Sequence, residues 1–201
     1  MRESFDYVIV GAGSAGSVMA NRLSADPSCR VLLLEAGGSD RGFRIQMPAA
    51  FSMAMGSPAY DWCYQSETEP GLDDRIISYP RGKVLGGSSS INAMCFTRGH
   101  PDDYDQWAGN GLPNWSYAHC LPYFKKMETF EGGADSYRGR EGPLHVSAPK
   151  ASSVLTEAFI DACEQAGNIR SPDTNGWCQD GVGISDQTIY AGRRVSAASA
   201  Y

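Results

Sequence analysis

Long hydrophobic runs are missing from this sequence of 201 residues. The longest purely aliphatic run is Val31–Leu34, which is far shorter than the roughly 20 residues that a membrane-spanning helix needs. The first residues are charged and lack the long apolar stretch of a secretory signal. We therefore expect a cytoplasmic protein without a membrane span.

Positive charge is also in short supply. The chain has 17 lysines and arginines against 23 aspartates and glutamates, a net charge of −6, and no basic cluster. Binding to nucleic acid relies on such clusters, so we expect no nucleic acid among the main partners. Apolar residues make up 42% of the chain, which is enough for a core and argues against wholesale disorder.

Metal-binding motifs are absent from the sequence. The six cysteines stand at least 15 positions apart, so no CxxC pair occurs, and the three histidines do not pair with cysteines at ligand spacing. We expect no metal site, and reduced cysteines that pack mostly as small hydrophobic residues. His100, His119 and His145 are each better explained as structural or solvated residues than as catalytic ones.

Glycine, by contrast, is plentiful, with 23 residues. The first cluster follows a short β-branched run at 7–10 and opens a helical segment that continues over 17–23. A second apolar run at 30–34 ends at Glu35. This order predicts a strand, a turn, a helix and a second, parallel strand. The glycines of the turn form a GxGxxG pattern at Gly11, Gly13 and Gly16.

The arrangement is typical of a dinucleotide-binding turn. Gly11 allows the tight turn, Gly13 lets a pyrophosphate approach the backbone, and Gly16 lets the helix pack on the strand. The helix N-terminus offers free N–H groups to phosphates, and the Glu35 carboxylate lies where it can accept from ribose hydroxyls. The turn is shared by NAD and FAD enzymes, and a glycine-rich turn without a ligand is the simpler alternative.

Residues 39–80 have no clear period and are rich in methionine, proline, glycine and aromatic residues. Such a segment is either a functional lid or a surface excursion. Tyr60, Trp62 and Tyr64 lie close together in it. They can pack beneath a lid or form an aromatic face for a quaternary ammonium group.

The remaining elements follow from periodicity and turn signals. They are helices over 116–127 and 153–166, strands over 144–146 and 183–190, and the start of a helix at 196. Ser116 is expected to cap the first of these helices, and Pro122 to kink it or shift its start. The second should be amphipathic and end at Gly167. Its apolar stripe consists of Leu155, Phe159, Ala162 and Ala166.

A second glycine- and serine-rich turn occupies residues 82–92. Gly86 and Gly87 let the backbone pass close to a cofactor, and the serines and Asn92 offer donors to it. The turn reads Gly82, Lys83, Val84, Leu85, Gly86, Gly87, Ser88, Ser89, Ser90, Ile91 and Asn92, with Phe96, Pro101 and Asp105 following. This stretch resembles the N-terminal signature of the glucose–methanol–choline (GMC) oxidoreductase family. Residues 6–16, 34–38, 60–62 and 114–116 look like the same family, and the resemblance runs over residues 5–201, closest to its choline dehydrogenase-like branch.

The resemblance implies FAD as the cofactor and an α/β fold. A partial Rossmann-like FAD-binding domain is expected over 1–130, with a lid-like excursion at about 39–80. The beginning of an α+β substrate-binding domain is expected over 131–190, and a return to the FAD-binding domain over 191–201. Some family members attach FAD through a histidine where this sequence has Ile91, so we expect non-covalent FAD.

The candidate cofactor-binding residues combine the two turns with positions carried over from the family. Val84 and the stretch from Asn92 to Cys95 are expected to line the flavin because the matching family residues do so. Arg81 or Lys83 either adds positive charge near the phosphates or forms a solvated surface pair. The full set is Gly11, Gly13, Ser14, Ala15, Gly16, Glu35, Ala36, Arg81, Val84, Gly86, Gly87, Ser88, Asn92, Ala93, Met94 and Cys95.

The family also implies a reaction, the oxidation of a primary alcohol such as choline with hydride transfer to flavin N5. Oxygen, a quinone or another acceptor then reoxidises the flavin. The family's catalytic histidine lies far along the C-terminal portion, so no catalytic residue is expected before Tyr201. Two parallel strands do not form an independently stable sheet, and we expect the chain to be the N-terminal part of a longer protein. An NAD(P)-linked dehydrogenase, a non-catalytic truncated fragment and a lyase on the same scaffold are the alternatives.

Overall fold

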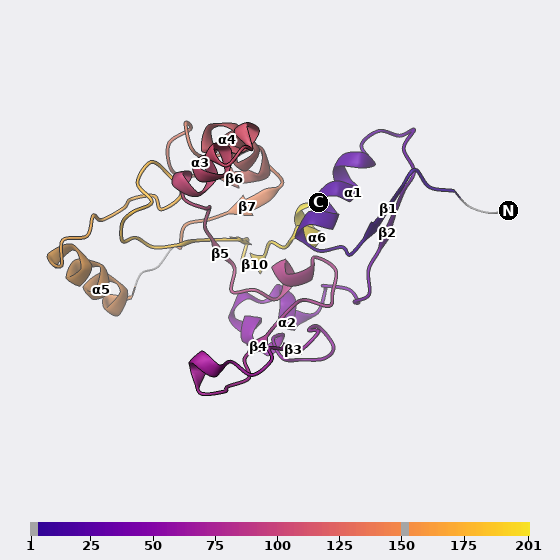
Figure 1. The fold of residues 1–201 in the computed structure, drawn as a ribbon, viewed down its shortest axis with the longest axis horizontal. Coiled ribbons are helices and arrows are strands. Elements are labelled where there is room, and N and C mark those ends of the chain that lie inside the picture. Colours follow the sequence, from indigo (N-terminus) through magenta and orange to yellow (C-terminus); the bar gives the residue numbers. More distant parts are fainter. Residues whose placement is uncertain (1–3, 150–152) are drawn as a thin grey trace. The chain divides into compact units, whose positions relative to one another are not determined.

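The computed structural model describes residues 4–149 and 153–201 (Figure 1). The chain divides into two compact units. The first runs to Met94 and resumes from Ala191 to Tyr201, and the second is Cys95–Tyr190. The shift in composition near residue 131 predicts the first domain boundary there, whereas the two compact units divide between Met94 and Cys95.

The first unit opens with the predicted strand, turn, helix and strand. Strand β1 (Tyr7–Val10) pairs in parallel with β2 (Val31–Leu34), in a register that sets Tyr7 opposite Val31. Helix α1 (Ser14–Leu23) connects them and packs beside the pair (Figure 1). The helix begins three residues earlier than the sequence suggested, because the GxGxxG turn itself forms its first turn.

One face of this two-stranded sheet is not covered by the described residues. Val8 is 57% exposed and Val10 is 82% exposed. Parallel strands in compact proteins are ordinarily covered on both faces, so these side chains are unusual for a sheet of this type.

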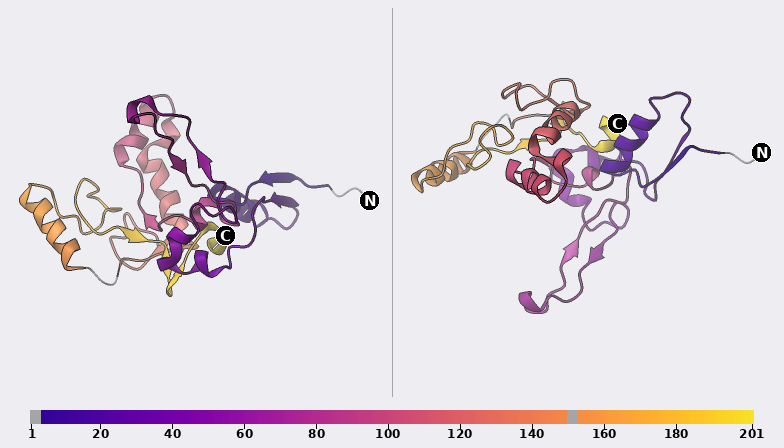
Figure 2. Two further views of the ribbon diagram at one scale, coloured as in Figure 1. Left: turned by 90° about the horizontal axis from the view of Figure 1, so that it is seen from below. Right: turned by 45° about the horizontal axis from the view of Figure 1, so that its top comes forward.

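The irregular segment after Gly38 contains short elements rather than none. Its core consists of Ile45, Ala54, Val84 and Ile91, all 2% exposed or less, with Tyr60 packed against them. A hairpin with a helical turn at its tip extends from this core within the first unit (Figure 2). The elements are α2 (Phe43–Gln46), η1 (Pro48–Met53), β3 (Tyr64–Gln65), η2 (Pro70–Leu72), β4 (Ser78–Tyr79), η3 (Gly87–Ser90), β10 (Arg193–Arg194) and α6 (Ala197–Ala200).

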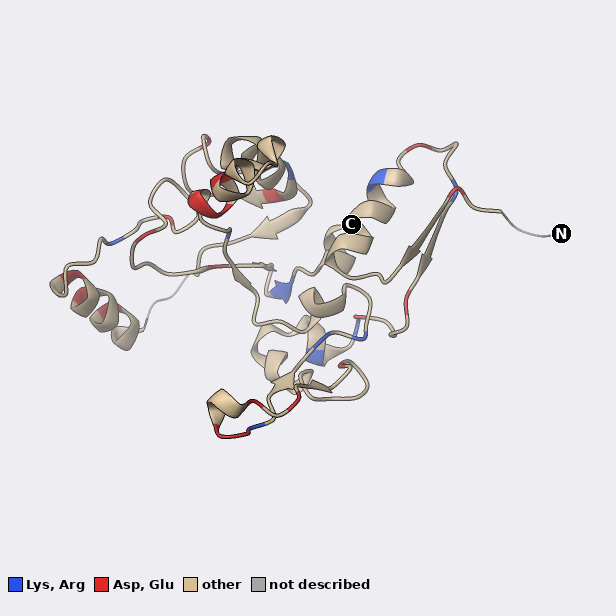
Figure 3. Cartoon of the chain, viewed as in Figure 1, with Lys and Arg blue, Asp and Glu red and all other residues tan. Residues whose placement is uncertain are grey.

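The second unit has a separate apolar core made by Phe96, Phe130 and Val146. Beneath it lies a buried ion network, in which Glu128 accepts from Arg98 and Arg138. The elements are β5 (Cys95–Phe96), α3 (Pro101–Gly109), η4 (Pro113–Trp115), α4 (Tyr117–Met127), β6 (Glu128–Phe130), β7 (Leu144–Val146), α5 (Val154–Gln165), β8 (Asp186–Gln187) and β9 (Ile189–Tyr190). Acidic residues mark the first turn of α3 and one face of α5 (Figure 3).

Several local expectations in this unit need correction. Helix α5 exists, but its expected core stripe is solvent-exposed: Leu155 is 82% and Phe159 is 65% exposed, and Ile160 is the buried residue instead. Ion pairs with Arg170 and the buried side chain of Ile160 hold the helix to the unit. The face that is buried is therefore not the one that the spacing of the apolar residues predicts. The single strand expected over 183–190 is two short strands, β8 and β9.

Two further expectations concern α4 and the cysteines. Ser116 stands at the N-cap of α4, but its hydroxyl bonds the His119 ring rather than a backbone N–H group. Pro122 does not shift the start, because the helix begins directly after Ser116 and runs through the proline. Cysteines are less buried than expected, since Cys178 alone of the six is fully buried.

Within residues 4–149 and 153–201, every helix falls short of the length or the hydropathy that a membrane crossing requires.

Candidate functional site

The two glycine-rich turns meet in the first unit, although their contacting residues are more than 70 positions apart in the sequence. The Gly86 N–H group donates to the Ala12 carbonyl at 2.8 Å. Gly87 lies directly against Gly13, because a Cβ atom added to Gly87 would stand 2.8 Å from the Gly13 Cα atom. The turns therefore form one backbone surface, and the contact requires glycine at position 87.

The first turn has the geometry that its sequence pattern predicts. Gly11 has a φ of +94°, a conformation that residues with a Cβ rarely adopt. At Gly16 a Cβ atom would lie 1.9 Å from the Gly11 carbonyl oxygen, so its role is to let α1 pack tightly on the turn. Gly13 is the N-cap of α1 and its Cβ position faces open space, with the nearest atom of the other turn 3.9 Å away.

An open cavity of about 810 Å³ lies where the turns meet the end of the sheet. This volume falls in the range of about 300–1,000 Å³ that ligand pockets occupy. The predicted site residues that line it are Gly11, Gly13, Ser14, Glu35, Ala36, Arg81, Gly87 and Ser88. The structure thus brings eight residues predicted from two distant motifs around one cavity.

Glu35 joins the first turn to the segment that follows β2. One carboxylate oxygen accepts from the Ala12 N–H group at 2.7 Å, and the other accepts from Gly37 N–H at 2.8 Å. A carboxylate has about four acceptor positions, so these two bonds leave room for ribose hydroxyls on the cavity side. Glu35 is therefore both a structural link and a candidate ligand group.

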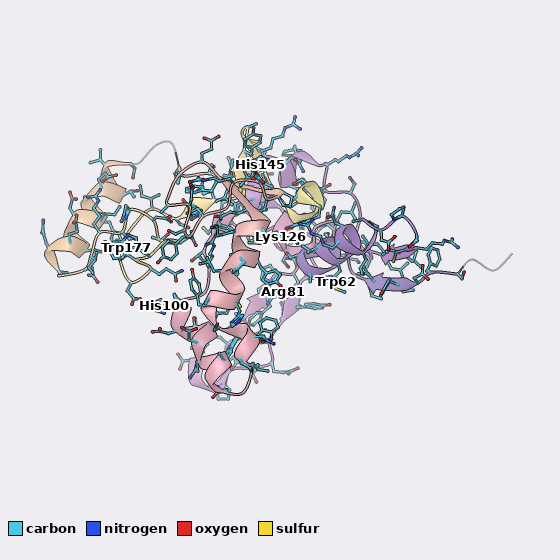
Figure 4. The ribbon with its side chains drawn as sticks, turned by 90° about the horizontal axis from the view of Figure 1, so that it is seen from above. Trp62, Arg81, His100, Lys126, His145 and Trp177 are labelled. Atoms are coloured by element: carbon cyan, nitrogen blue, oxygen red, sulfur yellow. The ribbon has the colours of Figure 1, made fainter. Side chains whose placement is uncertain are left out.

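Two aromatic residues of the irregular segment form a wall of the same cavity. Trp62 and Tyr64 line it, and their rings lie 6.0 Å apart with an interplanar angle of 7°. The Lys83 ammonium group stands 4.8 Å from the centre of the Trp62 ring, and Arg81 lines the cavity nearby (Figure 4). The sequence singled out these aromatics as a lid or an ammonium-binding face, and the structure places them beside the dinucleotide-binding turn.

Asp61 holds this wall in place, and sequence reasoning gave it no role. It is 2% exposed, and its carboxylate accepts from the N–H groups of Gly56, Cys63 and Arg81 at 2.7–2.9 Å. Burial raises the pKa of Asp61, but the three N–H groups outweigh it and hold the pKa below its usual value. The charged carboxylate therefore fixes the loop that carries Trp62 against the segment after β4 that carries Arg81.

Other predicted site residues do not line this cavity. Val84 is fully buried in the apolar core, and Gly16 and Gly86 act through backbone packing. Asn92 is exposed, and its side-chain oxygen accepts from Met94 N–H and from Arg194. Ala15, Ala93, Met94 and Cys95 are also outside the lining.

The three histidines all have local roles in the second unit. His100 caps α3 by accepting from the Asp102 N–H group at 3.2 Å. His119 bonds the Ser116 hydroxyl at 2.7 Å, and the His145 ring stacks on Tyr190 with 4.3 Å between centroids.

The donor set of the cavity fits a dinucleotide. Free N–H groups at the start of α1 and two nearby cations suit a pyrophosphate, while the carboxylate suits a ribose. Comparison with known sequences decides the family, because a sequence model of the GMC oxidoreductases matches residues 5–201. The chain belongs to the GMC oxidoreductases. The family is FAD-dependent, which confirms the expected cofactor over NAD(P), and its members share the α/β FAD-binding fold predicted from the sequence.

Individual relatives agree with this assignment. The chain is 51% identical to human mitochondrial choline dehydrogenase over 207 residues, covering 100% of this chain and 35% of that protein. It is 51% identical to an oxygen-dependent choline dehydrogenase of Staphylococcus xylosus, covering 37% of that protein. Among solved structures, pyridoxine 4-oxidase from Mesorbium loti superposes with a TM-score of 0.93 at 41% identity, covering 98% of this chain and 39% of that one. The chain thus spans a little over a third of the length of the relatives it matches.

Proposed function

We propose that this chain forms the FAD-binding part of an oxidoreductase that acts on the CH–OH group of a choline-like or other primary alcohol. The observation that carries the proposal is the cavity shared by the two glycine turns and Glu35. The choline dehydrogenases at about half identity support the substrate class. When bound, FAD would supply flavin N5 as the acceptor of the hydride that leaves the carbinol carbon.

The chain's own residues bind and orient the cofactor in this proposal. The N-terminus of α1 and the bare backbone of Gly13 and Gly87 receive the pyrophosphate, with Arg81 adding positive charge. Glu35 accepts from the ribose. Residues 92–95 hold the flavin end, as the matching positions do in the family. Residues 1–130 and 191–201 would then serve FAD binding and 131–190 the beginning of substrate binding.

The base that removes the hydroxyl proton is not assigned to any residue up to Tyr201. We propose that this group lies in sequence beyond the chain and that residues 1–201 alone do not oxidise alcohol. Oxygen, a quinone or another acceptor takes the electrons that reoxidise the flavin. A cytoplasmic location stays a prediction.

Gly13 offers a sharp test of the cofactor site. Its φ of −79° is open to any residue, and a Cβ atom there meets no protein atom closer than 3.9 Å. Gly13→Ala should therefore fold as the wild type does, while its methyl group enters the space of the pyrophosphate. In the full-length protein that contains this chain, we expect FAD affinity at least tenfold weaker than in the wild type, measured by titrating apoprotein with FAD.

Gly71→Ala, at the tip of the β3–β4 hairpin, is the matched control, because a Cβ atom there also meets nothing within 4 Å. It should bind FAD as the wild type does. A wild-type protein that is colourless when purified and binds NAD but not FAD would refute the proposal and favour an NAD(P)-linked dehydrogenase.

A further inference from the structure

Arg194 is a buried cation without an anionic partner. It is 2% exposed, and no carboxylate of the described residues lies within ion-pair distance of it. The other deeply buried arginines, Arg98 and Arg138, both pair with Glu128. Burial without a counter-charge lowers the pKa of Arg194 to about 10. An arrangement of this kind is costly for folding, so a stable fold alone does not explain it.

The guanidinium of Arg194 is bound to the second glycine turn by neutral acceptors. Its Nε atom donates to the Ile45 carbonyl at 2.9 Å. Its Nη1 atom lies 3.2 Å from the Ser89 carbonyl and 2.8 Å from both the carbonyl and the side-chain oxygen of Asn92. The Nη2 atom is buried and has no hydrogen-bond partner among the described residues. The planar fork therefore ties β10 and α2 to the end of the turn.

These contacts determine which way the Asn92 carboxamide faces. Its Oδ1 atom receives N–H groups from both Met94, at 3.0 Å, and Arg194, at 2.8 Å. Both neighbours are donors, so the oxygen must face them and the NH2 group must point the opposite way. Asn92 is an exposed residue, and the described residues provide no hydrogen-bond acceptor for its NH2 group.

We propose that Arg194 is a positioning residue for FAD, which holds the Asn92 NH2 group toward the flavin and places a fixed positive charge behind the turn. The inference rests on the proposed function, since it requires Asn92 to contact bound flavin. An NH2 donor and a buried cation both favour the more electron-rich reduced ring. Arg194 thus acts through Asn92 on cofactor affinity and on the potential of the bound flavin.

A double-mutant cycle in the full-length protein tests this coupling. Arg194→Lys keeps the charge but loses the fork that reaches several acceptors at once. We expect it to weaken FAD binding about tenfold and to lower the midpoint potential of the bound flavin. Asn92→Ala should have the same effects. In the Asn92→Ala background, Arg194→Lys should change FAD affinity less than threefold, because the group through which it acts is gone.

Arg193→Lys is the control, since Arg193 is the exposed neighbour in the same strand, and it should leave both quantities unchanged. Equal effects of Arg194→Lys in the two Asn92 backgrounds would overturn the inference, because they would show an action on the fold alone. So would wild-type FAD affinity and potential in Arg194→Lys. A wild-type protein that does not bind FAD would instead refute the proposed function.

Asn92→Asp keeps the test decisive if Arg194→Lys does not fold. The new carboxylate pairs with the guanidinium, so the melting temperature should be at least that of the wild type. FAD affinity should nevertheless fall, because the NH2 donor is lost. Unchanged FAD affinity in Asn92→Asp would contradict the inference.

Discussion

Replacing Gly87 by alanine should separate the two glycine turns. Gly87 has a φ of +55°, which costs an L-residue about 1–2 kcal/mol. The added Cβ atom would lie 2.8 Å from the Gly13 Cα atom. Carbon atoms prefer separations of about 3.5–4.0 Å, so the turns must move apart by about 1 Å. Backbone atoms stand on both sides of the contact, and no flexible side chain can relieve it.

The displacement acts directly on the bond that joins the turns. The Gly86 N–H to Ala12 carbonyl distance is 2.8 Å, and an increase of this size breaks it. A hydrogen bond of this kind contributes about 0.5–1.5 kcal/mol. Backbone strain and the lost bond together predict a decrease of about 1.5–3.5 kcal/mol in the free energy of unfolding.

Denaturant unfolding and FAD titration of the full-length protein measure both consequences. Because both turns line the cavity, we expect at least a tenfold loss of FAD affinity, about 1.4 kcal/mol. Gly71→Ala serves as the control because its Cβ atom meets open space. If Gly87→Ala matched Gly71→Ala in stability and in FAD affinity, the close contact between the turns would be refuted.

Three further perturbations probe other parts of the chain. Arg138→Ala leaves Glu128, Asp173 and Asp186 without their shared cation, so stability should fall by about 3–5 kcal/mol in denaturant unfolding, and a wild-type midpoint would contradict the buried network. Because the pKa of Asp61 is lowered in the folded protein, its carboxylate stabilises the fold above about pH 4, and this stabilisation is lost as the pH falls through the folded pKa. The stability of Asp61→Asn should therefore decrease less steeply with falling pH than that of the wild type. Parallel curves of stability against pH would count against this role. Acid precipitation should release FAD into the supernatant because Ile91 replaces the histidine of covalent attachment, and flavin that stays with the pellet would show a covalent bond.

The parts of the fold that the sequence predicts correctly are those with local causes. The first strand, turn, helix and second strand follow from a β-branched run, three spaced glycines and a carboxylate, all within 35 residues. Helices α4 and α5 likewise begin close to their expected N-caps. Each of these signals acts over a few residues, so the chain's other parts do not alter it.

The expectations that fail depend on tertiary contacts. The apolar period of α5 marks Leu155 and Phe159 as a core face, yet both are mostly exposed. An apolar period shows which residues share one face of a helix, but contacts with other parts of the protein determine which face is buried. The same holds for Trp62, whose place beside the first turn depends on the buried carboxylate of Asp61. Arg194 bonds Asn92, which lies 102 positions earlier in the sequence, and no local sequence pattern predicts that contact.

The backbone, more than the side chains, builds the candidate site. The Gly86 N–H group bonds the Ala12 carbonyl, and the Leu85 N–H group bonds the Gly38 carbonyl. Most substitutions leave such bonds intact, since they change no backbone atom. An added Cβ at a contact is different, because it pushes two backbones apart. Most substitutions around the site should therefore have little effect on it, whereas substitutions of a few glycines should disrupt it. For the same reason, two short glycine motifs are enough to predict much of the site from the sequence.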